Sequence, residues 1–436
     1  MNIVLLSGGS GKRLWPLSND IRSKQFLKIL KNEEGKYESM VQRVYRQICS
    51  VDPDAEITVA TSKSQISMIR NQLGDKVGIS VEPCRRDTFP AIALTTAYLH
   101  NIKGISEEEV IIVCPVDPYV EKEYFEALKA LGEQATKGDA NLVLMGIEPT
   151  YASAKYGYII PETSKQVSNV RYFKEKPDEE TAEQYIRQGA LWNGGIFAFK
   201  LKYLLEKAHE LIDFTDYQDL YDKYETVKKI SFDYAVVEKE PSIEVMRFSG
   251  EWKDLGTWNT LTDAMEENIV GNGILNDTNE NVHVINELDI PVLCMGLKNA
   301  VVCASVDGIL VSEKDASASI KPYVDKIDQQ IMYAEKSWGE FQVLDVAENS
   351  MTIKVTLKSG QRMNYHSHER RDEIWNIISG KGRTVVDGME QLVEPGDVIL
   401  VQAGCKHTII ADTELNIIEV QLGQEINVHD KQKYEL

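Results

Sequence analysis

Three glycines followed by two cations form the first group of residues in the chain that is suited to chemistry. Gly8, Gly9 and Gly11 come directly after a short apolar segment, and Lys12 and Arg13 follow them. Because glycine has no Cβ atom, backbone N–H groups in such a loop can approach an anion closely. The pattern therefore predicts a loop that binds phosphate groups, with Arg13 as a side chain that grips them.

Two standard phosphate-binding patterns do not fit this loop. A Walker loop requires Ser or Thr where Arg13 stands, and a dinucleotide-binding loop requires a glycine where Leu14 stands. An ordinary strand-to-helix turn is therefore an alternative. The local charge favours a site for a small polyanion, because residues 1–31 carry six basic side chains and one acidic side chain, a balance of +5.

A second group of residues has the spacing of metal ligands. His366 and His368 lie two residues apart on an expected strand, so their side chains point to the same face. Glu373 follows on the next strand, and His407 comes from a more distant one. Three histidines and one glutamate suit Zn²⁺, Mn²⁺ or Fe²⁺. The spacing of the glycines and histidines resembles the two-motif pattern of cupin barrels. The alternative to a metal site is that these are polar residues on a barrel face that bind no metal.

Alternating strands and helices must position the glycine loop. Apolar runs and helical periodicity predict a mostly parallel sheet with helices on both faces, an α/β arrangement. The expected strands cover residues 3–7, 55–61, 77–83, 109–117 and 140–147. The expected helices cover residues 37–50, 63–73, 90–102 and 122–136.

The C-terminal part of the chain has a different pattern of apolar residues. Residues 282–315 carry short, evenly spaced apolar runs, which suggest a small β-rich module, with a β-solenoid as one form. A helical connector is expected at 316–331, and strand after strand follows, as in an all-β barrel. We therefore expect three parts: an α/β domain (1–265), the β-rich module with its connector (266–331) and the barrel (332–436).

Composition excludes several classes of protein. The 436 residues carry a net charge of −20, which argues against nucleic acid as a partner. No apolar run approaches the roughly 20 residues that span a bilayer, and the short apolar start lacks the features of a signal peptide. Six scattered cysteines favour reduced thiols in a cytoplasm. The sequence does not fix the oligomeric state, and a homo-oligomer stays open.

The segment "LSGGSGKRLWPLSNDIRSKQFL" (6–27) resembles the opening signature of sugar-nucleotide pyrophosphorylases, in particular of mannose-1-phosphate guanylyltransferases. Ser23 stands where that family usually has proline, and Lys24 of its P-K-Q-F element is kept. Further stretches resemble the family in order, so the resemblance covers essentially the whole chain. They are residues 82–94, 114–120, 146–159, 173–178, 191–199, 231–239 and 251–258.

The resemblance implies a Rossmann-like domain that joins GTP and mannose 1-phosphate to give GDP-mannose and diphosphate, with Mg²⁺. It implies that the loop at Gly9 and Gly11, with Arg13, holds the β- and γ-phosphates and that Lys24 lies near the α-phosphate. It further implies that Asp117 and Asp254 hold the Mg²⁺ ion. Without the resemblance, a lone aspartate at a strand end is more simply a helix cap or turn residue.

The same resemblance assigns residues to the sugar and to the nucleoside. Glu175 would bind sugar hydroxyls and Lys176 the sugar phosphate, although a surface charge pair is the simpler local interpretation. Asn193 suits a hexose hydroxyl. Gly146 and Tyr158 are weaker candidates for the sugar pocket. Contacts to the nucleobase and ribose are expected from Glu82, Arg86 and Asp87.

In this family the barrel is often a phosphomannose isomerase with the motif Q-x-H-x-H-R-x-E-H-W. His366, Arg370 and Ile374 replace the motif's glutamine, second histidine and last histidine, so isomerase activity stays open. The leading hypothesis is a mannose-1-phosphate guanylyltransferase. The alternatives are a bifunctional transferase and isomerase, a nucleotidyltransferase for another sugar 1-phosphate, and a non-catalytic sensor of sugar nucleotides.

Overall fold

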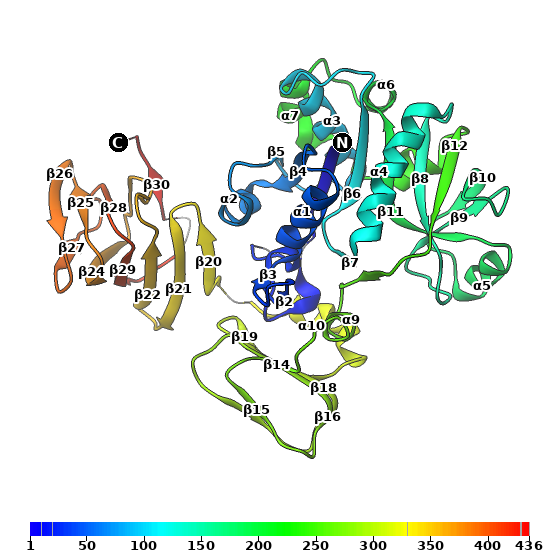
Figure 1. Cartoon of the computed structure of the whole chain (residues 1–436). Helices are drawn as coiled ribbons and strands as arrows, with labels where there is room; N and C mark the ends of the chain where they lie inside the picture. The colour runs from blue at the N-terminus through cyan, green and yellow to red at the C-terminus, as the bar shows by residue number, and fades with distance from the viewer. Residues whose placement is uncertain (10, 20, 329, 428–429, 436) are drawn as a thin grey trace. The chain divides into compact units, whose positions relative to one another are not determined.

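The computed structural model describes residues 1–9, 11–19, 21–328, 330–427 and 430–435 (Figure 1). The chain forms two compact units. The first contains residues 1–10 and 23–266, and the second contains residues 11–22 and 267–436. The division into three domains stays a prediction. Segment 11–22, which carries part of the glycine loop, groups with the second unit.

A nine-stranded sheet organises the first unit, in the order β5-β4-β1-β6-β11-β8-β12-β10-β9. Strands β1, β4, β5 and β6 are parallel, as the alternation of strands and helices predicts, whereas β11 runs antiparallel to both β6 and β8. The strands are β1 (Asn2–Ser7), β4 (Glu56–Ser62), β5 (Gly78–Glu82), β6 (Val110–Pro115), β8 (Leu142–Ile147), β9 (Gly157–Pro161), β10 (Val167–Lys174), β11 (Leu191–Lys200) and β12 (Ile243–Phe248). Two short strand pairs accompany the sheet: β2 (Leu30–Lys31) with β3 (Tyr37–Glu38), and β7 (Pro118–Val120) with β13 (Trp252–Asp254).

Helices pack against this sheet. They are α1 (Met40–Val51), α2 (Ile66–Leu73), α3 (Thr88–Asn101), α4 (Lys122–Lys137), α5 (Glu179–Arg187), α6 (Leu201–Leu211), α7 (Tyr217–Lys223), α8 (Phe232–Ala235) and α9 (Trp258–Thr262). Short 3-10 helices lie between them: η2 (Lys24–Phe26), η3 (Lys63–Gln65), η4 (Tyr224–Thr226) and η5 (Val237–Lys239). Local sequence sets their starts: Ser39 and Gln42 form a capping box at α1, and the Asp87 side chain caps α3.

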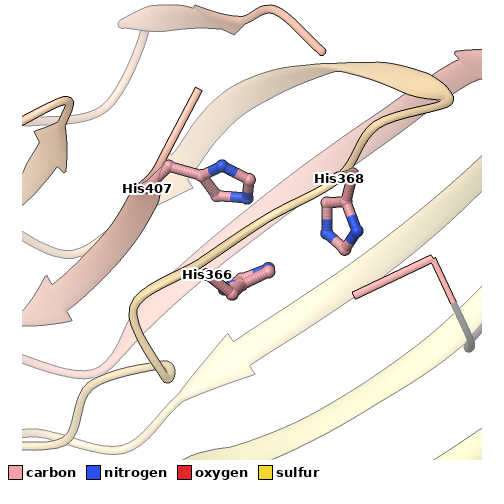
Figure 2. A group of neighbouring side chains, drawn as sticks. All are labelled: His366, His368 and His407. Carbon is pink, nitrogen blue, oxygen red and sulfur yellow. The ribbon is translucent and has the colours of Figure 1, made fainter. Parts of the chain in front are cut away.

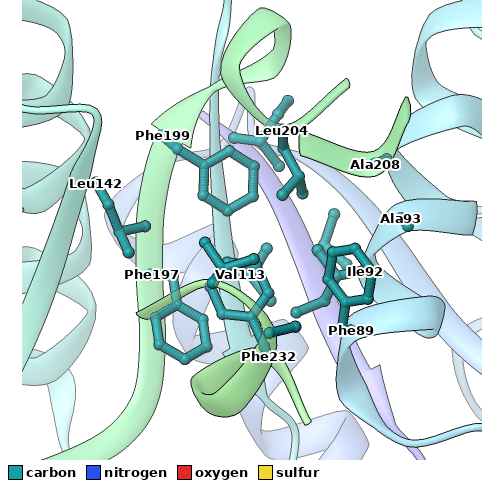
Figure 3. Packing of buried hydrophobic residues seen from close by; sticks show 14 of the residues in the cluster. Phe89, Ile92, Ala93, Val113, Leu142, Phe197, Phe199, Leu204, Ala208 and Phe232 are labelled. Carbon is teal, nitrogen blue, oxygen red and sulfur yellow. The ribbon is translucent and has the colours of Figure 1, made fainter. Parts of the chain in front are cut away.

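The core of the first unit lies where α3 meets the sheet (Figure 3). Phe197 and Phe199 of β11 pack with Phe232 of α8, with ring centroids 4.6 and 6.2 Å apart. Phe89 of α3 and Val113 of β6 belong to the same buried cluster. Burying each large apolar side chain contributes about 1.5–3 kcal/mol, so this cluster holds the strand ends in place.

A small β-rich module opens the main part of the second unit. Its strands β14 (Ile269–Gly271), β16 (Glu280–Asn286) and β18 (Lys298–Ser305) are parallel, as are β15 (Gly273–Leu275) and β17 (Val292–Cys294). β19 (Gly308–Glu313) pairs antiparallel with β18. This stacking of successive parallel strands agrees with the expected solenoid. The connector contains η6 (Ala316–Ser319) and α10 (Lys321–Val324).

Segment 11–22 packs on this module. It contains η1 (Lys12–Leu14). The Arg22 guanidinium donates to both oxygens of Glu287, at 2.8 and 2.7 Å, and Asn19 donates to Asp307 at 2.7 Å. An added Cβ atom at Gly308 would lie 2.4 Å from the Trp15 ring, so only glycine fits there.

Two antiparallel sheets form the C-terminal barrel, as predicted. One has the order β20-β21-β22-β29-β24-β27, and the other has the order β26-β25-β28-β23-β30. The strands are β20 (Tyr333–Lys336), β21 (Gly339–Val346), β22 (Ser350–Leu357), β23 (His366–Ser367), β24 (Arg371–Ser379), β25 (Gly382–Val386), β26 (Met389–Val393), β27 (Val398–Val401), β28 (His407–Ala411), β29 (Leu415–Gly423) and β30 (Gln432–Lys433).

All six cysteines are free thiols. Among the described residues, none of the helices combines the length and the apolar character that a membrane crossing requires.

Candidate functional sites

A lysine lies between two carboxylates in the first unit. Lys24 belongs to η2, Asp117 follows β6, and Asp254 ends β13. The Lys24 Nζ atom lies 2.8 Å from Asp117 Oδ2 and 3.2 Å from Asp254 Oδ1. Burial lowers the pKa of Lys24, but the two carboxylates outweigh burial and raise it. The fold thus brings together the three residues expected around the metal and the α-phosphate, and the two carboxylates already share one cation.

The glycine loop begins where β1 ends. Gly8 and Gly9 are exposed, and the Gly9 carbonyl accepts hydrogen bonds from Ser23 Oγ at 3.1 Å and Arg85 Nη2 at 3.4 Å. Gly11 has φ +64°, in the left-handed region that favours glycine, and Arg13 is exposed on η1. The binding of phosphates by Gly8, Gly9, Gly11 and Arg13 stays a prediction.

Three of the expected sugar-binding residues lie in one cluster. Lys176 Nζ lies 2.5 Å from Glu175 Oε1, and Asn193 Nδ2 donates to Asp233 Oδ1 at 2.6 Å. Burial, with help from the negative charge of Glu175, raises the pKa of Asp233 to about 6. An added Cβ atom at Gly157 would lie 2.5 Å from Glu175 Oε2, so glycine there leaves room for the carboxylate. The arrangement suits the binding of hydroxyl groups.

The sequence reasoning missed Asp233 in this cluster. The signal that could have indicated it is its place in segment 231–239, one of the stretches that resemble the family. Its contact with Asn193 joins residues 40 positions apart, which no local pattern shows.

Gly146 and Tyr158 have packing roles. The Tyr158 side chain is 0% exposed, and its hydroxyl accepts from Ser153 N at 2.9 Å and Trp192 Nε1 at 3.1 Å and donates to the Ser153 carbonyl at 3.1 Å. An added Cβ atom at Gly146 would lie 2.5 Å from Leu191 Cδ1. Close packing of β8 against its neighbours therefore explains Gly146, and sugar contacts from these two residues stay a prediction.

The residues expected near the nucleoside lie at the end of β5 and the start of α3. Glu82 is 7% exposed, and Tyr224 Oη donates to its Oε2 at 2.7 Å. Burial is the main reason that the pKa of Glu82 is raised to about 7. Arg86 donates to the Glu225 carbonyl, and Asp87, at φ +72°, caps α3 through Thr88 N at 2.7 Å. Tyr224, which the sequence did not indicate, thus fixes the orientation of Glu82.

Three histidines converge in the barrel (Figure 2). His366 lies on β23, His368 follows that strand, and His407 begins β28. One ring nitrogen from each lies within 4.8 Å of the others. Figure 2 shows the three rings facing a common space. The spacing of two residues and the distant third histidine therefore meet as the sequence predicts.

Backbone carbonyls fix the protonation of these rings. His366 Nδ1 contacts the Asn364 carbonyl at 2.6 Å, His407 Nδ1 contacts the Cys405 carbonyl at 2.9 Å, and His368 Nδ1 contacts the Asp430 carbonyl. Because a carbonyl oxygen only accepts, each Nδ1 carries the proton, and each Nε2 keeps its lone pair. Burial is the main reason that the pKa falls to about 2 for His366 and about 4 for His368. Neutral rings are the form that binds a metal.

Glu373 completes the group. Its Oε1 lies 3.2 Å from His368 Nε2 and accepts from Arg371 Nε at 3.1 Å, and its Oε2 lies 3.4 Å from His407 Nε2 and accepts from Trp375 Nε1 at 3.1 Å. Burial raises the pKa of Glu373, but His407, His368 and Arg371 outweigh burial and lower it. His407 Nε2 is buried and has no hydrogen-bond partner in the described part of the chain. This donor set fits a divalent metal ion.

Sequence comparison places the first unit in a family. Residues 2–269 match the family described as nucleotidyl transferase. The chain belongs to this family. Residues 325–435 match a second family, described as mannose-6-phosphate isomerase C-terminal. Both matches agree with the resemblance and the fold class that the sequence predicts.

Several full-length relatives of this nucleotidyl transferase are known. A mannose-1-phosphate guanylyltransferase of Salmonella typhimurium is 28% identical over 98% of this chain and 95% of its own length. An alginate biosynthesis protein of Pseudomonas aeruginosa is 27% identical over 99% of this chain and 96% of its own. A crystal structure described as a mannose-1-phosphate geranyltransferase from Thermus thermophilus has a TM-score of 0.62 and 28% identity, and it covers 74% of this chain and 98% of its own.

Proposed function

We propose that this nucleotidyl transferase is a mannose-1-phosphate guanylyltransferase, which makes GDP-mannose and diphosphate from GTP and mannose 1-phosphate. The observation that carries the proposal is Lys24 between Asp117 and Asp254 at the edge of the parallel strands. Full-length relatives that bear this name support the choice of sugar and base.

The chemistry joins two polyanions, so positioning and charge neutralisation carry most of the catalysis. An oxygen of mannose 1-phosphate forms a bond to the α-phosphorus of GTP while the bond from that phosphorus to the β-phosphate oxygen breaks, which releases diphosphate. No covalent enzyme intermediate is needed. Lys24 would neutralise charge at the α-phosphate. Asp117 and Asp254 would hold Mg²⁺, which supplies further positive charge to the phosphates when bound.

Other side chains would bind the two substrates. Lys176 would contact the sugar phosphate, and Glu175 and Asn193 the hydroxyls. The Glu82 carboxylate pairs well with the N1–H and 2-amino donors of guanine, and Tyr224 orients it. Arg86 and Asp87 would lie near the nucleoside. Gly8, Gly9, Gly11 and Arg13 would hold the leaving phosphates, a role that the sequence supports.

A substrate panel tests this proposal. Diphosphate release is measured with the full chain and Mg²⁺, for four nucleoside triphosphates combined with mannose 1-phosphate and other hexose 1-phosphates. Release that is fastest with GTP and mannose 1-phosphate is expected. Fastest release with another pair would indicate a different sugar or base. Binding of GDP-mannose without any release would indicate a sensor, the non-catalytic alternative.

The product suggests the setting. GDP-mannose donates mannosyl groups to polysaccharides, and one relative is named for alginate biosynthesis. We place this activity in the cytoplasm, where GTP is available, with small molecules rather than nucleic acid as partners.

A second candidate function belongs to residues 325–435, namely the interconversion of mannose 6-phosphate and fructose 6-phosphate. Two observations favour it: the match to an isomerase family and the metal-ready histidines in the barrel. Zn²⁺, Mn²⁺ or Fe²⁺ held by His366, His368, Glu373 and His407 would polarise sugar oxygens. The test is incubation of the full chain, loaded with each metal in turn, with fructose 6-phosphate, followed by detection of mannose 6-phosphate. No conversion with any of the three metals would exclude this activity.

A further inference from the structure

The barrel contains an open cavity of about 740 Å³ whose wall includes more than the metal-binding group. His366, His368 and Glu373 line it on one side. Glu419 and Gln421 of β29 line it as well. Neither of these two residues has a role in the functions proposed above, and together they form the strongest unexplained feature of the described chain.

A carboxylate at position 419 interrupts an apolar row. The inward-facing residues of β29 are Leu415, Ile417, Glu419 and Gln421, and the first two belong to the barrel's hydrophobic core. Glu419 is 6% exposed. Transfer of an ionised carboxylate from water to such a place costs several kcal/mol unless it is paired, so packing alone would favour another aliphatic side chain.

The neighbour of Glu419 is incompletely bonded. Gln421 Nε2 donates to Glu419 Oε1 at 2.5 Å, which fixes one carboxyl oxygen. Gln421 is 4% exposed, and its Oε1 atom is buried without a hydrogen-bond partner among the described residues. An unpartnered buried acceptor costs about 1–3 kcal/mol, and it is explained most simply if a ligand in the cavity donates to it.

Cations line the same cavity. Lys336, Lys431 and Lys433 come from β20, the C-terminal segment and β30. Loss of hydration lowers the pKa of the half-buried Lys336 and, although Lys431 keeps an exposed surface, that of Lys431 as well. A phosphate group in the cavity would stabilise the charged form of both lysines. The cavity therefore combines a metal-ready side, a carboxyl group and an anion-binding group.

We infer that Glu419 is the acid–base residue of this cavity, which moves a proton between adjacent carbons of a phosphorylated hydroxy-carbonyl compound. The inference rests on the second candidate function. Glu419 takes the proton from C2 of the aldose as the C1–C2 double bond of an enediol forms, and it returns that proton to C1. The hydroxyl proton passes from O2 to O1. C2 is oxidised as C1 is reduced, so no external oxidant or reductant is needed.

The state of the carboxyl group agrees with this role. Burial, reinforced by the negative charge of Glu373, raises the pKa of Glu419 above its ordinary value. Its carboxyl group lies in the wall of the same cavity as His366, His368 and Glu373, where it can accept a proton from a bound sugar and return it. Gln421 acts through Glu419, as a positioning residue that holds one carboxyl oxygen.

The test uses the full chain with Glu419→Gln, which keeps size and hydrogen bonding but removes the acid–base group. Conversion of mannose 6-phosphate to fructose 6-phosphate and exchange of the C2 hydrogen in D₂O are followed by NMR. We expect both rates to fall at least 100-fold. Metal content, unfolding temperature and diphosphate release with GTP and mannose 1-phosphate should stay as in the wild type. Glu390→Gln, at an exposed position of β26, is the matched control and should change none of these readouts.

Three outcomes would overturn the inference. One is conversion by Glu419→Gln within threefold of the wild type. Another is a metal-loaded wild type that shows neither conversion nor C2 exchange. If Glu419→Gln does not fold, Glu419→Asp is the variant that tests the role. It keeps a carboxyl group but shortens the side chain by one methylene, which moves the carboxyl group away from the substrate. A loss of at least tenfold supports the role, and full conversion contradicts it. Diphosphate release reports separately on the proposed transferase function.

Discussion

In the first unit, Lys24 lies between two carboxylates whose side chains are 33% and 39% exposed, whereas the three histidines of the barrel are 1–3% exposed. Charge holds the first group together. Backbone carbonyls and burial hold the second. Under the proposed function the ionic group would rearrange on binding, because Mg²⁺ would compete with Lys24 for Asp117 and Asp254, and the triphosphate would compete with these carboxylates for Lys24. In the histidine group the Nδ1 atoms are already bonded to backbone carbonyls, and Arg371 Nη2 lies 2.8 Å from His368 Nε2.

The difference teaches what each kind of site requires. A triphosphate brings its own charge and metal, so flexible ions that exchange partners suit it. A resident metal has to be held between turnovers, so fixed neutral ligands with bonded Nδ1 atoms suit it. Changing a charge should therefore affect the first site most, and changing a ligand should affect the second.

The largest effect is expected from Lys24→Met. It removes the ammonium group that lies 2.8 Å from Asp117 and that would neutralise the α-phosphate. We expect kcat for diphosphate release to fall about 1,000-fold, equivalent to about 4 kcal/mol, as for loss of a preorganised transition-state contact. Steady-state kinetics with GTP and mannose 1-phosphate measures it. Lys122→Met, at an exposed helix position, is the control, and a kcat for Lys24→Met within threefold of the wild type would contradict the assignment.

The barrel should respond differently, through its metal. His407→Ala removes one of three converging ligands, and we expect the Kd for Zn²⁺ to rise at least 100-fold. Competition with a chelator and metal analysis after dialysis measure this. Diphosphate release should not change, because the nucleotidyl transferase site uses other residues. His209→Ala, an exposed histidine of α6, is the control. Unchanged metal retention in His407→Ala would refute the metal site.

Local pattern predicted parts of both sites. The two-residue spacing of His366 and His368 fixes a common face on a strand, and Asp117 directly follows a buried strand, so both places were readable from the sequence. The order of strands and helices likewise predicted the α/β unit and the all-β barrel. These features depend on neighbours in sequence.

Contacts between distant segments were not predictable. Tyr224 reaches Glu82 across 142 positions, and segment 11–22 groups with the second unit although it directly follows β1. All five residues of β9 are buried, so no alternation showed that Tyr158 points into the core. Such contacts depend on tertiary packing. They produce no periodic pattern in the sequence, so they cannot be predicted from local residue spacing.

Glu82 extends the comparison, because it is a carboxyl group of the first unit whose pKa burial raises. Its pKa is about 7 in the folded chain against 4.5 in the unfolded chain, so the folded state binds more protons between these values. The contribution of Glu82 to the free energy of unfolding therefore falls as pH rises from 4.5 to 7. The free energy of unfolding of Glu82→Gln, measured relative to the wild type, should be about 2 kcal/mol higher at pH 8 than at pH 5. Urea unfolding at both pH values measures it.

The control for this prediction is Glu126→Gln, at an exposed position of α4. It should keep the same difference from the wild type at both pH values, because its side chain stays exposed when the chain folds. If Glu82→Gln also shows no dependence on pH, the Glu82 carboxyl group does not have a raised pKa in the folded chain.

The smallest effect is expected at Tyr158, where a substitution can distinguish a packing role from a sugar-binding role. Tyr158→Phe removes a hydroxyl group that bonds Ser153 and Trp192 and reaches no solvent. Because the buried partners lose their bonds, the free energy of unfolding should fall by about 1 kcal/mol. KM for mannose 1-phosphate should stay within twofold, whereas Asn193→Ala should raise it at least tenfold at similar stability. A large rise in KM for Tyr158→Phe would return Tyr158 to the sugar pocket, and would mean that the substrate opens a contact that the ligand-free fold keeps closed.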